Sequence, residues 1–236
     1  MPKFGRRAFM KTAALAGASL LPAGLSLADD EEDGGINAGD AAMLRFLAAA
    51  ETLETDAWQQ YTELAMNNPA YNMAISAIDG DMPAYLAQQT ADSASHAAFI
   101  NAFLVSVHRQ PVNLETFRTL SSSPATGAAQ VPRLTNLAHL TVDTSWYLRY
   151  RSTANPDFGA KFSQVVNIVD RPGIPEHDGY TANQIQAVAN TGAFHFAMLE
   201  AGGSSLYDTL SLKATNPVVL RMLTSIGGTE VAHFAI

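Results

Sequence analysis

Apolar and polar positions alternate with a helical period along most of this chain. The first periodic segment begins near Ala41 and ends near Met66, where Asn67-Asn68-Pro69 stops it. Its apolar stripe consists of Leu44, Leu47, Ala50, Leu53, Glu54, Ala57, Tyr61 and Leu64. A second helix is predicted from Pro83 to His108, and its stripe consists of Leu86, Gln89, Ser93, His96, Ile100 and Phe103. An acid, Glu54, therefore lies within the apolar stripe of the first helix, and a histidine, His96, within that of the second.

Two further helices are predicted near the C-terminus. The third runs from about Thr181 to Leu199, and the glycine pair Gly202-Gly203 leaves its continuation to Leu210 open. The fourth begins at Asn216-Pro217, an N-cap followed by proline in the first turn, and continues to Ile236. No C-terminal glycine or basic turn closes it, so we expect the chain to be truncated there.

Residues 111–180 show no sustained period. Prolines at positions 111, 124, 132, 156, 172 and 175 break this segment into turns. The stretch Leu134–Tyr150 fits a short helix or a strand equally well. A connection of this length allows the second and third helices of a bundle to run in the same direction. The pattern thus predicts an all-α bundle of four helices with a long crossover insert.

The N-terminus resembles an export signal. Arg6-Arg7 and Lys11 match a twin-arginine motif, an apolar stretch follows, and Ser26-Leu27-Ala28 offers a cleavage site. Pro22 and several glycines interrupt the apolar stretch, which favours removal of residues 1–28 over a membrane anchor. Residues 29–40 are acidic and glycine-rich, so we expect a flexible leader before a domain spanning 41–236. The predicted location is the periplasm or the exterior.

The composition of the chain limits which partners it can bind and which ligands a metal site can use. Residues 1–28 carry four basic and no acidic residues, so their removal takes the formal net charge from −8 to −12. Nucleic acid is therefore an unsuitable partner, and no second long apolar run predicts stable membrane insertion. The chain contains no cysteine, so any metal site must use carboxylate and imidazole ligands.

One order of residues occurs twice. Glu54 and Glu200 are each followed seven residues later by a tyrosine, Tyr61 or Tyr207. Downstream of each lies a histidine with a partner three residues before it: Ser93 and His96, then Glu230 and His233. Residues three apart share a helix face. Two helices with a lone Glu and two with Glu-x-x-His hold a dinuclear centre in four-helix bundles, and here serine occupies one of the six positions.

Three stretches carry a family resemblance: residues 143–151, residues 194–207 and residues 226–234. They are similar to the ferritin-like superfamily, and closest to the ferritin-like proteins that include desiccation-related proteins, over about residues 41–236. The resemblance implies that iron or manganese binds to Glu54, His96, Glu200, Glu230 and His233, with redox activity toward oxygen or peroxide. Position 93 departs from the family pattern.

Because Ser93 occupies one expected ligand position, several sets of metal ligands stay open. Asp92 lies about 100° around the helix from position 93, and His195 lies about 140° from Glu200, so each reaches the site only from its flank. A mononuclear site would need neither residue. Glu51 is expected at the surface, and the two tyrosines are expected to pack in the core.

The function therefore has three interpretations. The first is a degenerate carboxylate–histidine metal site with redox activity. The second is a metal-free helical protein of stress or desiccation protection, which Ser93 favours. The third is metal storage or carriage in a homo-oligomer, which requires a shell-forming surface.

Overall fold

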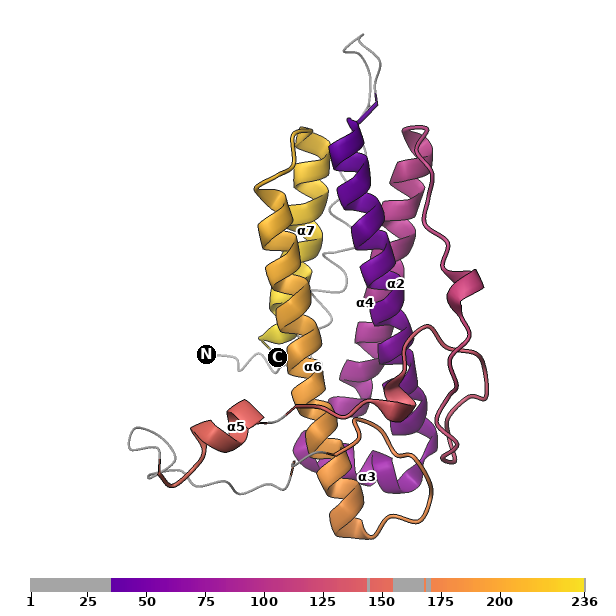
Figure 1. The fold of residues 1–236 in the computed structure, drawn as a ribbon, viewed down its shortest axis with the longest axis vertical. Helices are drawn as coiled ribbons and strands as arrows, with labels where there is room; N and C mark the ends of the chain where they lie inside the picture. The colour runs from indigo at the N-terminus through magenta and orange to yellow at the C-terminus, as the bar shows by residue number, and fades with distance from the viewer. Residues whose placement is uncertain (1–34, 144, 155–167, 169–170, 236) are drawn as a thin grey trace, which may run out of the picture. The chain divides into compact units, whose positions relative to one another are not determined.

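The computed structural model describes residues 35–143, 145–154, 168 and 171–235. Within these ranges the regular structure is helical, with two isolated β-bridges and no strand (Figure 1). Four helices are long: α2 (Ala38–Asn67), α4 (Met82–Ser106), α6 (Ala182–Ser211) and α7 (Pro217–Phe234). The all-α class predicted from the sequence is confirmed. The export signal predicted over residues 1–28 and most of the acidic leader lie outside the described residues.

The helix ends follow local capping chemistry. Asn37, Thr181 and Asn216 each accept a hydrogen bond from a backbone N–H in the first turn of α2, α6 and α7. Thr181 also forms a reciprocal capping box with Gln184. The third helix does not stop at Leu199, because α6 continues through the glycine pair to Ser211.

One helix was not predicted from the sequence. Asn68 ends α2 and at the same time caps α3 (Pro69–Ile78), with its side chain accepting from the backbone N–H of Tyr71. Pro69 occupies the first turn of α3, where its missing N–H costs no hydrogen bond. The same Asn-Pro pair marked the start of α7, so the signal for α3 was present.

The long helices pack in two pairs, α2 with α4 and α6 with α7, and α3 contacts α6, α2 and α4. One apolar cluster draws residues from all four long helices, including Leu47, Ile100, Tyr207 and Leu223. A second cluster, centred on Trp58 and Tyr61, lies between α2, α3 and α6. None of the described helices combines the length and apolar character that a membrane span requires.

Hydrogen bonds fix the directions of the helices. Asp40, in the first turn of α2, accepts from the backbone of Thr215 and Asn216 in the turn between α6 and α7. Arg109, just after α4, donates to the carbonyl of Ile36, just before α2. The C-terminal ends of α4 and α6 therefore lie at the same end of the fold, so these two helices run in the same direction (Figure 1).

The connection between α4 and α6 returns along the length of the fold. Its described part contains two 3₁₀ turns, Glu115–Phe117 and Leu137–His139, and the short helix α5 (Ser145–Tyr150). The stretch Leu134–Tyr150, left open between helix and strand, thus forms a 3₁₀ turn and a helix. Tyr147 of α5 packs edge-on against Phe194 of α6, with ring centroids 4.8 Å apart.

Candidate metal centre

Acids and imidazoles from four helices meet in the interior. Glu51 projects from α2, His96 from α4, Glu200 from α6, and Glu230 and His233 from α7. The three glutamates are each only 1% exposed, although ionised carboxylates are rarely buried without a partner. They and the two histidines form two groups whose ligand atoms lie within 4.8 Å of one another.

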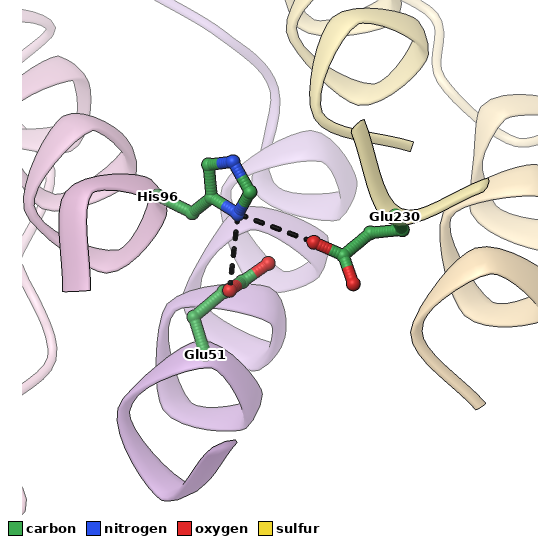
Figure 2. Close-up of side chains that lie close together, drawn as sticks. All are labelled: Glu51, His96 and Glu230. Atoms are coloured by element: carbon green, nitrogen blue, oxygen red, sulfur yellow. Dashed lines mark hydrogen bonds and ion pairs between the residues drawn. The ribbon is translucent and has the colours of Figure 1, made fainter. Parts of the chain in front are cut away.

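The first group is Glu51, His96 and Glu230. Nδ1 of His96 lies 3.3 Å from Oε2 of Glu51 and 3.3 Å from Oε1 of Glu230 (Figure 2). A single ring nitrogen holds one proton or one lone pair, so the two carboxylates have to share its one N–H. Three ligand atoms directed at one small volume form the kind of arrangement that a cation would bridge.

The second group is Glu200, Glu230 and His233. Nδ1 of His233 lies 3.4 Å from Oε2 of Glu200 and 4.0 Å from Oε1 of Glu230. Glu230 thus belongs to both groups, and the same oxygen faces both histidines. A carboxylate shared in this way is placed to bridge two adjacent ions.

Neighbouring side chains hold the candidate ligands in orientation. Nε2 of His233 lies 3.1 Å from Oδ2 of Asp92, and Gln88 donates to the other oxygen of Asp92 at 2.7 Å. The hydroxyl of Tyr207 donates to Oε1 of Glu51 at 2.5 Å. A histidine that ligates through one nitrogen commonly donates from the other to a carboxylate, which fixes its tautomer.

Burial and neighbouring charges shift the pKa values of the acids and imidazoles in the cluster. Burial raises the pKa of Glu51 and Glu200 above the ordinary range. Burial also lowers the pKa of the imidazoles, but adjacent carboxylates outweigh it and raise the pKa of His96 to about 10 and of His233 to about 9. Apart from these imidazole contacts, neither oxygen of Glu200 or Glu230 has a hydrogen-bond partner within the described residues. This acid-rich donor set fits a hard or borderline cation.

Four of the five ligands named from the sequence come together: His96, Glu200, Glu230 and His233. Glu54 lies at the edge and belongs to neither group. Its Oε1 accepts from Nε1 of Trp58 at 3.1 Å. Burial, followed by the charges of Glu230 and Glu51, raises the pKa of Glu54 to about 9, so its carboxylate is electrostatically part of the cluster.

The prediction that Glu51 lies at the surface is wrong. It is buried because it continues a seven-residue spacing on α2 that runs Leu44, Glu51, Trp58 and Ala65, all at most 1% exposed. This spacing was readable from the sequence, but the stripe chosen there passed through Glu54. Glu51 therefore supplies a carboxylate beside His96. This histidine lies three positions after Ser93 on α4.

The two substitutes considered for Ser93 take other roles. Asp92 contacts His233 from the far side of its ring and stays outside both groups. His195 pairs with Tyr61 instead, with Nδ1 2.7 Å from the hydroxyl oxygen. Ser93 itself is buried, 2% exposed.

Gly203 on α6 makes room for Glu230. A Cβ at this position would lie 2.6 Å from Oε2 of Glu230, whereas a Cβ at Gly202 would meet no atom within 4 Å. Of the two glycines, Gly203 is therefore the one whose missing side chain leaves space for the Glu230 carboxylate.

Comparisons of the chain with protein-family models, with curated proteins and with solved structures found no match. The functional inference therefore rests on the geometry of the cluster.

Proposed function

We propose that this chain is a ferritin-like four-helix bundle with a crossover insert, and that it binds a pair of iron or manganese ions in its interior. The observation that carries the proposal is the convergence of two carboxylate–imidazole groups on Glu230. Long helices that each contribute acids or Glu-x-x-His pairs are the arrangement by which such bundles hold two ions.

The described residues suit two neighbouring ions. Glu51 and His96 would bind one, Glu200 and His233 the other, and Glu230 would bridge them. Glu54 adds a fourth glutamate at the edge. Four carboxylates match the charge of two divalent cations. Glu51, which was not among the six positions of the sequence pattern, therefore offsets the charge lost with Ser93.

The bound ions would supply one-electron redox chemistry toward oxygen or peroxide. The protein's own residues orient the ligands and exclude water. Tyr207 holds Glu51, and Asp92 holds His233. Leu47, Ile100 and Ile226 belong to the apolar cluster on the four long helices, which keeps bulk water out of the interior.

The alternative function is a metal-free helical protein of stress or desiccation protection. Two observations favour it: the neutral Ser93 at a ligand position, and the raised pKa of both imidazoles. Protonated His96 and His233 would offset two of the buried acids without any metal.

Metal analysis of protein purified under metal-replete conditions separates the two functions. We expect about two ions per chain, and Glu230→Gln should abolish most of this content because it removes the shared carboxylate at unchanged volume. Asp208→Asn removes an exposed acid of α6 and serves as the matched control, with metal content unchanged.

The opposite result would support the alternative. A chain that stays metal-free after anaerobic addition of Fe²⁺ or Mn²⁺, with an unchanged melting temperature, has no such site. Ser93→Glu gives an independent reading, because restoring the sixth ligand to an intact site should tighten metal binding.

A further inference from the structure

Gln89 on α4 is buried without a partner for its amide group. The residue is 1% exposed, and within the described part of the chain neither the nitrogen nor the oxygen of its carboxamide makes a hydrogen bond. Leaving such a group unsatisfied in the interior costs free energy. The amide is therefore free to bind a small polar ligand that reaches the interior.

This amide lies on the face of α4 that carries the cluster. Gln89 precedes Ser93 by four residues and His96 by seven, and these spacings place all three side chains on one helix face. Burial and the charge of Glu200 raise the pKa of Tyr85, one turn before Gln89. Gln89 lies near the same hydroxyl, although no hydrogen bond joins them. The amide and the acids therefore border one region of the interior.

Ser93 lies between Gln89 and His96 on this face. It is 2% exposed and occupies the position at which the repeated pattern expects glutamate. A helical side chain covers the turn before its own Cα, so a glutamate at position 93 would extend over the turn that contains Gln89. Serine carries a hydroxyl where glutamate carries a methylene group and a carboxylate. The fragment that distinguishes them has the heavy atoms of acetate.

We propose that a short monocarboxylate, of the size of formate or acetate, binds between Gln89 and the metal centre and supplies the carboxylate that Ser93 lacks. The inference rests on the proposed function, because bound ions provide the positive charge that attracts the ligand. The N–H group of Gln89 donates to the carboxylate. The hydroxyl of Ser93 donates either to the carboxylate or to the amide oxygen of Gln89.

The charge of the site determines when this ligand binds. The four glutamates match the charge of two divalent ions, but two trivalent ions exceed them by two positive charges. An added anion is therefore favoured most when the bound ions are trivalent. Without metal, the buried acids repel a carboxylate at the same place. We therefore expect binding to protein loaded with iron(III) and none to the metal-free chain.

The first test measures binding of radiolabelled acetate to iron-loaded, air-oxidised protein by equilibrium dialysis. Gln89→Met keeps the length of the side chain but removes the N–H groups, so the affinity for acetate should fall about tenfold. Gln59→Met makes the same change at an exposed position of α2 and should bind acetate like the parent chain. Equal affinity in Gln89→Met and the parent would overturn the proposal, because the free amide is the observation on which it rests.

The second test supplies the carboxylate from the chain itself. Ser93→Glu should abolish acetate binding while iron stays bound, because its own side chain takes the place of the ligand. Ser95→Glu adds the same charge at an exposed position of α4 and should leave acetate binding intact. Unlabelled formate should displace labelled acetate, whereas benzoate is too large for a buried site. Acetate that still binds to Ser93→Glu, or that benzoate displaces equally well, lies elsewhere and overturns the proposal.

Iron content and melting temperature, measured on the same samples, separate two kinds of failure. Acetate at about ten times its Kd should raise the melting temperature of the iron-loaded chain by about 3–6 °C relative to sodium chloride at equal ionic strength. The metal-free chain should show no such rise. Iron-loaded protein that binds no acetate overturns the carboxylate site and leaves the metal site standing. Absence of bound iron contradicts the proposed function, and the carboxylate site falls with it.

Discussion

At the scale of single residues, the interior cluster concentrates groups that hold more protons in the folded chain than in the unfolded one. Glu54 has a pKa of about 9 where an ordinary glutamate has 4.5, because burial and neighbouring carboxylates disfavour its ionised form. The acids around His96 and His233 outweigh burial and raise the pKa of both imidazoles from 6.5, to about 10 and about 9. All three shifts have the same sign.

Metal-free protein should therefore lose stability as the pH rises from 6.5 to 9. In this window the unfolded chain has released protons that the native state still binds, so the free energy of unfolding falls with pH. Each such proton contributes about 1.4 kcal/mol per pH unit. Thermal melts in chelator across this range should show a falling melting temperature, and Glu54→Gln should make the slope shallower.

Added Mn²⁺ provides the control for this pH dependence. The metal displaces protons from its ligands, so its stabilising effect should grow as the pH rises. A melting temperature of the metal-free chain that is flat or rises between pH 6.5 and 9 would contradict these pKa shifts.

At the scale of helices, the contact between α6 and α7 depends on small residues. A Cβ at Gly203 would meet Glu230, and a Cβ at Gly227 would lie 2.8 Å from Cβ of Tyr207. Glycine costs helix stability, so its presence at these contacts reflects packing rather than helix propensity. Close approach of the two backbones is what places Glu230 opposite Glu200.

Gly203→Ala should destabilise the protein by about 1–3 kcal/mol and reduce its metal content, because the new methyl group overlaps the Glu230 carboxylate. Gly202→Ala is the matched control on the same helix. It should stabilise the protein by about 0.5–1 kcal/mol, since its methyl group meets open space and alanine favours the helix. Denaturant unfolding of both variants measures the difference, and equal effects would argue against the close contact.

At the scale of the whole molecule, Asp56 attaches the connection between α4 and α6 to α2. This carboxylate is 1% exposed and accepts from the backbone N–H groups of Leu134 and Thr135. It also accepts from the hydroxyl of Thr135 and from Nη1 of Arg118, the latter at 2.6 Å. One side chain of a long helix thereby holds two separate parts of the insert.

Asp56→Asn should destabilise the protein by about 3–5 kcal/mol, since the new amide directs N–H groups at donors and leaves Arg118 without its buried partner. Limited proteolysis should then cut residues 111–143 faster, with the helical circular dichroism largely retained. Glu115→Gln removes the exposed partner of the same arginine and should change stability by less than about 0.5 kcal/mol. Similar proteolysis rates in the two variants would show that Asp56 does not hold the insert.

The sequence by itself determined the four long helices, because their apolar periods and most of their caps are local properties of the chain. Thr181 and Asn216 start α6 and α7 where their side chains can cap them, and the proline-rich stretch that follows α4 remains irregular. The sequence also named four of the five residues that meet in the cluster. For Glu230 and His233 the reason is local, since residues three apart share a helix face.

Only the tertiary structure decided which acid of α2 enters the cluster. Glu51 and Glu54 lie on neighbouring strips of one helix, about 60° apart, and the packing of α4 and α7 selects the strip that is buried. The pairing of His195 with Tyr61, rather than with Glu200, has the same origin. Spacing along a helix fixes the direction of a side chain relative to its own axis, whereas its partners depend on how the other helices pack against it.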